Sequence, residues 1–405
     1  MLEQLEEYAE AEKAYRRGLL IAPENERLYD ALADLKRRQE DPAGEIEVLR
    51  QKLAERSGDP AALLRLAQIY EDQGDRPAAL VELETLVERH PEHTTAQLRL
   101  GYLYFLEGRL EDAIVRFTEV ERHDPNAEEV RYFLGVVHEQ AGNGDEALAA
   151  LETVPPASEY YGDARRLIAH IWEDRGDYER ALGLLERTVE LVPDNRELKV
   201  FRAGVLQRSG QLDAAVEVMT GLIDAEPGDA DLHYDFGVLY GEAEDWSRAV
   251  EIMQQVLELE PDHASALNFI GYSWADRGER LDEAEGLIRR ALELRPGDGY
   301  ITDSLGWVFY QRGLQRLEDG RDRDAREAFS SAVRELERAV ELTKPGDPVI
   351  TRHLADAYRS VSRFSDAIAT YRRSLELDPS EEDLLEIHRQ IELLVLQSAP
   401  PGAAR

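Results

Sequence analysis

Residues 96–125 read AQLRLGYLYFLEGRLEDAIVRFTEVERHDP, and this stretch predicts the fold of the chain. Its first half places apolar or small residues at Leu100, Gly101 and Tyr104, and its second half repeats that spacing after a break at Gly108. Spacings of three and four residues predict amphipathic helices. Glycine ends the first helix because it tolerates the left-handed C-cap conformation, and proline marks the end of the second. The stretch therefore predicts a pair of helices.

The same pattern recurs along the chain with a period near 34 residues. Prolines mark it, because the gaps between the six that close a unit are 34, 68, 34, 34 and 35 residues: Pro91, Pro125, Pro193, Pro227, Pro261 and Pro296. Small residues recur where two helices of a pair would cross, and a larger side chain there would cost roughly 1–3 kcal/mol. Ten full units are expected to begin near Asn25, Pro60, Thr94, Glu128, Gly162, Arg196, Ala230, Ala264, Gly299 and Pro348.

A Leu–Gly–x–x–Tyr motif followed by Ala, then Phe or Leu, then Pro, on this period, resembles the tetratricopeptide repeat. The likeness covers nearly the whole chain. It implies an all-α fold, an α-solenoid whose helix pairs stack into a right-handed superhelix. The expected organisation has six parts: a half repeat with only its second helix (1–24), eight units (25–298), an enlarged unit (299–347), a final unit (348–380), a capping helix (381–397) and a disordered tail (398–405).

In the enlarged unit Ala332 lies 19 positions after Gly313, where the corresponding separation in an ordinary unit is 5. The 14 additional residues equal two heptads, so we expect both helices to be about two turns longer, with a new turn at residues 319–322. A flexible loop at 314–331 is the alternative. Self-association through the same segment would make the chain an oligomer.

Composition excludes several classes of protein. The chain has 405 residues with 84 acidic and 48 basic side chains, a net charge of −36 and a pI near 4.6, so a nucleic-acid partner is not expected. No apolar run approaches the roughly 18 residues of a transmembrane helix, and the acidic first twenty residues do not resemble a secretory signal. The absence of cysteine excludes disulfides, thiolate metal sites and a cysteine nucleophile.

No chemistry-bearing motif stands out. Among the nine histidines, His90 and His93 are three apart but straddle Pro91 without a carboxylate framework, so no metal site is expected. The phosphate-binding loop G-x-x-x-x-G-K-[ST] and the G-x-S-x-G nucleophile elbow are both absent from the sequence. We therefore expect no enzyme activity and no cofactor.

The tetratricopeptide likeness implies that the first helix of each unit lines an inner, concave groove. Its exposed positions would be the second, fifth, ninth, twelfth and thirteenth. Aromatic residues with polar groups on such a surface are typical interface anchors. The candidate partner-binding residues are Tyr102, Phe105, Tyr132, Tyr234, Asn268, Tyr272, Asp276, Tyr300, Asp303, Trp307, Tyr310, Gln311 and Arg352, with Asp356 and Arg359 in the last unit. The alternative is that these rings pack against a neighbouring helix and bind nothing.

The stretch from Ala266 to Gly313 is similar to a block in Gram-negative bacterial proteins with many such repeats. Some members are outer-membrane lipoproteins that bind a carboxyl-terminal processing protease and bring it to cell-wall hydrolases. The resemblance implies a periplasmic adaptor whose partner is such a protease. The lipidated cysteine of those members is absent, so the compartment stays open between periplasm, outer membrane and cytoplasm.

Two functions follow from the sequence. The first is a non-catalytic scaffold that binds a peptide or partner protein in its concave groove. The second is a structural subunit of an envelope or polysaccharide-export complex, which would work through self-association.

Overall fold

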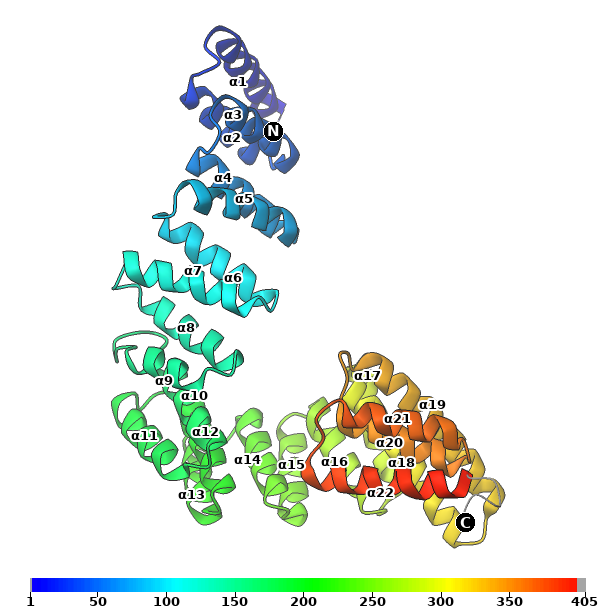
Figure 1. Ribbon diagram of the computed structural model, residues 1–405. Coiled ribbons are helices and arrows are strands. Elements are labelled where there is room, and N and C mark those ends of the chain that lie inside the picture. Colours follow the sequence, from blue (N-terminus) through cyan, green and yellow to red (C-terminus); the bar gives the residue numbers. More distant parts are fainter. Residues whose placement is uncertain (1, 399–405) are drawn as a thin grey trace, which may run out of the picture. The chain divides into compact units, whose positions relative to one another are not determined.

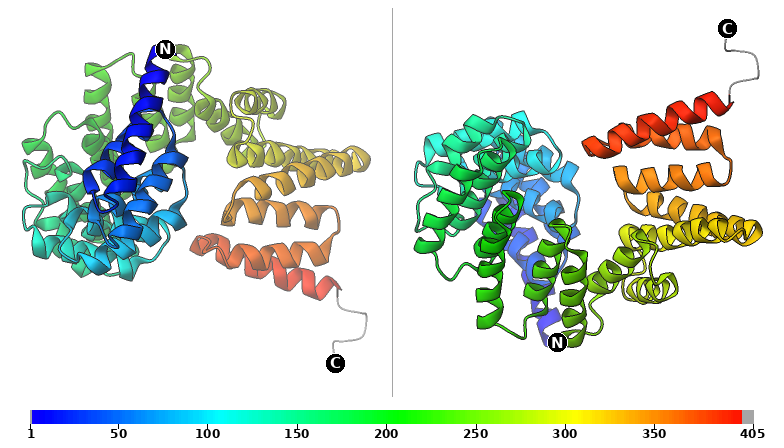
Figure 2. Two further views of the ribbon diagram at one scale, coloured as in Figure 1. Left: turned by 90° about the horizontal axis from the view of Figure 1, so that it is seen from above. Right: turned by 90° about the horizontal axis from the view of Figure 1, so that it is seen from below.

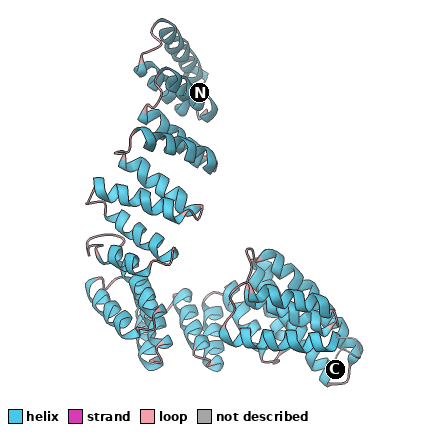
Figure 3. Ribbon diagram, viewed as in Figure 1, coloured by secondary structure: helices cyan, strands magenta, loops and turns pink. Residues whose placement is uncertain are grey.

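A computed structural model describes residues 2–398, and within this part of the chain it contains 22 α-helices and no strand (Figure 3). Their order is shown in Figure 1, and their bounds are α1 Leu2–Ile21, α2 Glu26–Arg38, α3 Pro42–Glu55, α4 Pro60–Asp72, α5 Arg76–Arg89, α6 Thr94–Leu106, α7 Leu110–His123, α8 Glu128–Gln140, α9 Gly144–Glu152, α10 Tyr161–Asp174, α11 Tyr178–Leu191, α12 Arg196–Arg208, α13 Leu212–Ala225, α14 Ala230–Glu242, α15 Trp246–Leu259, α16 Ala264–Asp276, α17 Leu281–Leu294, α18 Gly299–Glu318, α19 Asp322–Leu342, α20 Pro348–Ser360, α21 Phe364–Leu375 and α22 Glu381–Ser398.

The chain divides into two compact units, an N-terminal unit (Met1–Val205) and a C-terminal unit (Leu206–Arg405), with the boundary inside α12. In both units an even-numbered first helix pairs with the odd-numbered second helix that follows it, and successive pairs stack side by side (Figures 1 and 2). The predicted all-α solenoid is confirmed.

Small residues allow the helices of one pair to approach closely. In the N-terminal unit a methyl group added at Gly101 would lie 2.8 Å from the ring of Phe117, which is fully buried. In the C-terminal unit the same addition at Gly271 would meet Ile288 at 2.6 Å and the carbonyl oxygen of Ala284 at 3.0 Å. Such distances are shorter than carbon atoms tolerate, so a larger residue at these positions requires a neighbouring side chain or helix to shift.

A left-handed residue recurs between the first and second helix of a pair. From α4 to α11 of the N-terminal unit it is glycine at intervals of 34 residues, for example Gly74 (φ +76°) and Gly176 (φ +73°), whereas Glu40 (φ +55°) occupies the turn between α2 and α3. Glycine suits this place because it adopts positive φ without a steric cost from a Cβ atom. In the C-terminal unit Gly210 and Gly278 keep this spacing, and Glu244 (φ +60°) occupies the turn between α14 and α15. The aspartate that follows then caps the second helix, as Asp245 does by accepting a hydrogen bond from the backbone N–H of Arg248.

The enlarged part of the C-terminal unit is a long helical hairpin. α18 has 20 residues and α19 has 21, compared with 13 and 14 in the preceding pair. Residues 314–331 are helical apart from the turn at 319–321, where Gly320 adopts φ +72°. Apolar side chains of the terminal helix α22, Ile387 and Leu394, are buried in the same core as this hairpin.

The two ends of the chain were expected to be a half repeat and a disordered tail. At the N-terminus α1 is one continuous helix, Leu2–Ile21, within the range of the expected half repeat. The predicted disorder of 398–405 lies outside the described residues, apart from Ser398, the last residue of α22.

Candidate functional site

Four of the predicted partner-binding residues line one hollow in the C-terminal unit. They come from three successive first helices: Tyr234 from α14, Asn268 and Tyr272 from α16, and Tyr300 from α18. The hollow has a volume of about 250 Å³, and its other lining residues are Ser265, Phe269, Arg295, Asp298 and Ile301. We call this site the tyrosine groove. The repeat places these residues together because stacked units bring equivalent positions of their first helices side by side.

Local interactions hold the walls of the tyrosine groove in place. The carboxylate of Asp298 caps α18 by accepting hydrogen bonds from the backbone N–H groups of Tyr300 at 2.9 Å and Ile301 at 3.1 Å. Tyr300 is therefore fixed in the first turn of the helix, where its side chain is 60% exposed. Arg295 donates a hydrogen bond to the hydroxyl of Ser265 at 3.2 Å, which links the end of this unit to its own first helix, α16.

The hydroxyls of Tyr234 and Tyr272 stay protonated near neutral pH. Burial raises the pKa of Tyr234 above its ordinary value, and its ring stacks on His263 with 5.0 Å between centroids. Burial also raises the pKa of Tyr272, and the carboxylates of Asp276 and Asp303 act in the same direction. These hydroxyls can therefore donate and accept hydrogen bonds, while their rings supply apolar surface.

Asn268 supplies a polar atom without a partner inside the tyrosine groove. Its side-chain carbonyl oxygen is buried and accepts no hydrogen bond from any residue that the structure describes. A buried acceptor left unsatisfied costs free energy, roughly 1–3 kcal/mol, which an incoming N–H group would recover. A rotation of the carboxamide that turned this oxygen toward the hollow would let it accept a hydrogen bond from a ligand such as a peptide backbone.

The expected exposure of Asp303, Trp307 and Tyr310 is wrong, because all three side chains are buried. Two rings stack on Trp307: Tyr310 at 4.7 Å between centroids and His353 at 3.9 Å. Its indole Nε1 donates a hydrogen bond to Asp276 at 3.0 Å. Large aromatic side chains at these positions reach the next first helix, α20, and are covered by it. Whether they contribute to partner binding stays a prediction.

Ion pairs and hydrogen bonds extend this buried polar network. Nδ1 of His353 lies 3.0 Å from both carboxylate oxygens of Asp303. Tyr371 donates a hydrogen bond to the buried Asp356, and Arg352 forms ion pairs with Asp356 at 3.6 Å and with Asp383 of α22 at 3.0 Å.

Other candidates of this end of the chain join the network as well. Arg359 donates to the hydroxyl of Tyr310 at 3.3 Å. The carboxamide of Gln311 is directed at the backbone oxygen of Asp276, at 3.5 Å. Several of the predicted groove residues therefore already have partners within the protein.

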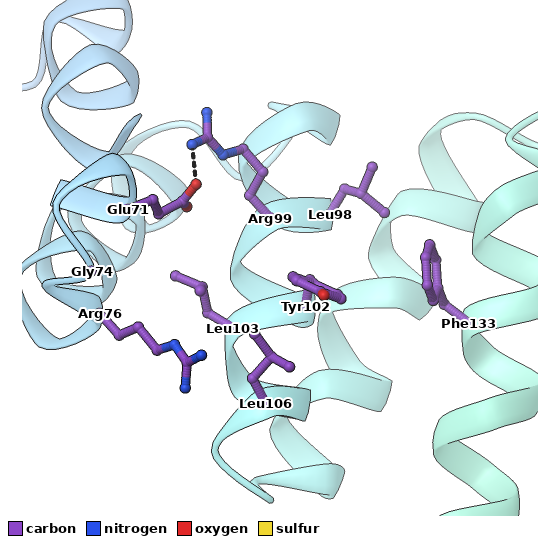
Figure 4. Close-up of a pocket in the computed structure, with 9 residues that line it drawn as sticks. All are labelled: Glu71, Gly74, Arg76, Leu98, Arg99, Tyr102, Leu103, Leu106 and Phe133. Carbon is purple, nitrogen blue, oxygen red and sulfur yellow. Dashed lines mark hydrogen bonds and ion pairs between the residues drawn. The ribbon is translucent and has the colours of Figure 1, made fainter. Parts of the chain in front are cut away.

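The three predicted partner-binding residues of the N-terminal unit have different surroundings. Phe105 is partly buried in the core of that unit, and Tyr132 stacks on Tyr160 with 5.1 Å between centroids. Tyr102 is 45% exposed and lines a hollow of about 420 Å³ (Figure 4). We call this second site the apolar hollow. Its lining residues are Glu71, Gly74, Arg76, Leu98, Arg99, Tyr102, Leu103, Leu106 and Phe133.

Sequence reasoning missed residues that both sites depend on. His353 is the sixth residue of α20, and Phe133 is the sixth residue of α8. This position lay outside the set expected to face the groove, although each ring contacts an aromatic side chain of the preceding first helix. Arg295 was missed because it lies in the linker between units. Comparing the sixth position of each unit with the ninth of the unit before it would have indicated both ring contacts.

Two further findings concern the chemistry of the described residues. Within residues 2–398 there is no group of three or more histidine and acidic side chains arranged to hold a metal ion. Over the same part of the chain no helix combines the length and the apolar character that crossing a bilayer requires.

The stacked helix pairs and their repeated turn define a helical-repeat protein. Models of the tetratricopeptide repeat match residues 104–171 and 173–234 in one case, and 64–117, 234–299 and 309–382 in another. The chain belongs to the tetratricopeptide repeat family. Repeats of this family bind protein partners and are typically non-catalytic scaffolds.

Two comparisons with individual proteins agree with this assignment. The TPR repeat-containing protein PA4667 of Pseudomonas aeruginosa is 50% identical over 52 residues, which is 13% of this chain and 9% of that protein. The chain thus matches less than a tenth of this relative's length. The crystal structure of yeast Tom70 superposes with a TM-score of 0.58 and 16% identity, covering 97% of this chain and 93% of Tom70. The second likeness concerns the fold alone.

Proposed function

We propose that this protein is a non-catalytic scaffold that holds an extended peptide segment of a partner protein in the tyrosine groove. The observation that carries the proposal is the convergence of Tyr234, Tyr272 and Tyr300 on one hollow together with the unsatisfied carbonyl oxygen of Asn268. Tyrosine is enriched in protein interfaces because its ring buries apolar area while its hydroxyl keeps a hydrogen bond. A peptide backbone has N–H groups that can donate a hydrogen bond to the side-chain oxygen of Asn268.

The charge of the chain supports a partner that is basic around the docked segment. A net charge of −36 accelerates the encounter with a positively charged partner, and salt screens this attraction. The charged residues of the groove itself, Arg295 and Asp298, are engaged within the protein, so the groove recognises its ligand mainly through rings and hydrogen bonds.

Site-specific crosslinking tests the proposal in living cells. The photoreactive residue p-benzoyl-phenylalanine is incorporated at Tyr300, which is exposed at the rim of the groove. The matched control places it at Leu259, an exposed residue at the end of the second helix α15. We expect a defined protein adduct from position 300 that is absent from position 259. Equal adducts from both positions, or none from position 300, would reject the groove.

A narrower proposal makes the chain a periplasmic adaptor for a carboxyl-terminal processing protease. It is supported by the similarity of residues 266–313 to a block in repeat proteins with that role. Mass spectrometry of the adduct at Tyr300 decides it, because the adaptor requires that protease or one of its substrates in the adduct. An adduct with a second copy of the same chain would instead favour an assembly subunit that self-associates.

A further inference from the structure

We propose that the apolar hollow of the N-terminal unit binds a peptide segment in which a large apolar side chain lies next to a carboxylate. The site is distinct from the tyrosine groove, since each is formed within its own unit. The proposal therefore does not depend on the function of that groove.

The floor and one wall of the hollow are apolar surface in contact with solvent. Tyr102 is 45% exposed and Leu106 is 40% exposed, although both lie on α6 beside the buried Leu103. The volume of about 420 Å³ lies within the roughly 300–1,000 Å³ of typical ligand sites. Apolar surface of this kind in a concave place is stabilised when an apolar side chain displaces the water from it.

The wall formed by Phe133 is held rigid by aromatic packing. Its ring meets Tyr102 edge-on, with 6.2 Å between centroids and 62° between planes. On another side it stacks on Phe117 at 5.7 Å, and Phe117 is fully buried in the core. The shape of the hollow is therefore formed before a ligand binds, which lowers the entropy lost on binding.

The charges at the mouth of the hollow decide which kind of peptide fits. Arg99 forms an ion pair with Glu71 and is neutralised (Figure 4). Arg76 is exposed, and it forms no hydrogen bond or ion pair with another residue in the described part of the chain. Its guanidinium group extends into the space beside Leu103 and Leu106 (Figure 4).

A free arginine beside apolar surface is complementary to a carboxylate on an apolar ligand. Guanidinium groups bind carboxylates through paired hydrogen bonds, and the planar group is weakly hydrated, so it tolerates a partly apolar site. Other surface charges of this acidic chain repel an anionic ligand, which makes Arg76 the local determinant of the preference.

Binding of two small probes to the full chain tests the proposal. N-acetyl-phenylalanine carries an aromatic side chain and a free carboxylate, and N-acetyl-phenylalaninamide has the same ring without the charge. Saturation-transfer NMR measures the affinity of each. We expect the carboxylate to bind at least about threefold more tightly than the amide, as for a partly exposed ion pair. Arg76→Gln should remove this preference, and Leu106→Asn should weaken the binding of both probes.

Arg38→Gln is the matched control, since Arg38 is also an exposed arginine of the N-terminal unit and lies outside the hollow. It should leave the affinity of both probes unchanged. Equal affinity of the two probes for the unmodified chain would overturn the proposal, as would failure of both to bind. A preference that survives Arg76→Gln, or is lost equally in Arg38→Gln, would also overturn it. Circular dichroism of each variant verifies that the helices are intact.

Discussion

Tyr102 in the N-terminal unit and Trp307 in the C-terminal unit occupy the same place in their repeats. Each is the ninth residue of a first helix, α6 and α18 respectively. Tyr102 is 45% exposed, whereas Trp307 is 7% exposed. The first lines a hollow open to solvent, and the second is part of a core. A repeat position therefore does not decide by itself whether a side chain is available to a partner.

The difference arises from the neighbouring units. The sixth residue of the following first helix is Phe133 in one case and His353 in the other. Phe133 meets Tyr102 edge-on at 6.2 Å, which leaves much of the ring uncovered, while His353 stacks on Trp307 at 3.9 Å. Trp307 also donates a hydrogen bond to Asp276 of the preceding unit. The closer ring stacking and the hydrogen bond together explain why Trp307 is buried at a repeat position where Tyr102 is exposed.

The largest expected effect is on the buried polar network of the C-terminal unit. His353→Ala should lower the free energy of unfolding by about 3–5 kcal/mol, because it removes a buried ring and leaves the buried carboxylate of Asp303 unpaired. His353→Phe introduces the residue type that the N-terminal unit has at the equivalent position, Phe133, and keeps a ring on Trp307. It should lower the free energy of unfolding by about 1–3 kcal/mol. Urea unfolding followed by circular dichroism measures both.

His170 provides the control for that pair of variants. It is an exposed histidine of the N-terminal unit that lies 3.6 Å from Asp174 on the same helix. His170→Ala should change stability by less than about 0.5 kcal/mol. If His353→Ala were no more destabilising than His170→Ala, the network would not distinguish the two units.

Two left-handed turns, one with glycine and one with glutamate, provide the second comparison. Gly176→Ala in the N-terminal unit should cost about 1–2 kcal/mol, because φ is +73° there and a Cβ is unfavourable in that conformation. Glu244→Gly in the C-terminal unit should have the opposite sign, because it removes a Cβ from a residue with φ +60°. The gain should stay below about 1 kcal/mol, since glycine loses more entropy on folding. Thermal unfolding detects both shifts, and a gain from Gly176→Ala would contradict the turn assignment.

The smallest expected effect concerns acid stability. Burial by itself would raise the pKa of Glu285, but hydrogen bonds from Arg312 and Arg289 hold that pKa below its ordinary value. A carboxylate with a lowered folded pKa stabilises the protein above the unfolded value, about 4.3, and this contribution is lost as pH falls through the folded pKa. Unfolding experiments on Glu285→Gln should therefore show a shallower loss of stability below that pH, by up to about 1 kcal/mol.

A matched glutamate of the N-terminal unit serves as the control. Glu119 is paired with Arg122 in the same helix, on the exposed surface of α7. Glu119→Gln should leave the pH dependence almost unchanged, because solvent screens an exposed pair. A pH profile altered equally by both substitutions would show that the contact between α17 and α18 adds nothing beyond a surface pair.

Much of the fold could be predicted because its determinants are local. Apolar spacing, a glycine after the first helix and a proline after the second all act within one 34-residue unit, and they place the helix pairs and their turns. The groove was predicted less well. Tyr234, Asn268, Tyr272 and Tyr300 do meet in one hollow, but Asp303, Trp307 and Tyr310 do not face solvent.

The sequence by itself determined the repeat, its helical pairs and the acidic, cysteine-free surface, since each of these is written within single units or in the composition. Only the tertiary structure decided which aromatic rings remain open to a partner. Trp307 is covered by His353, 46 positions further along the chain, whereas Tyr102 remains open beside Phe133. Exposure depends on the distance and angle between rings of adjacent units, and a one-unit pattern contains neither quantity.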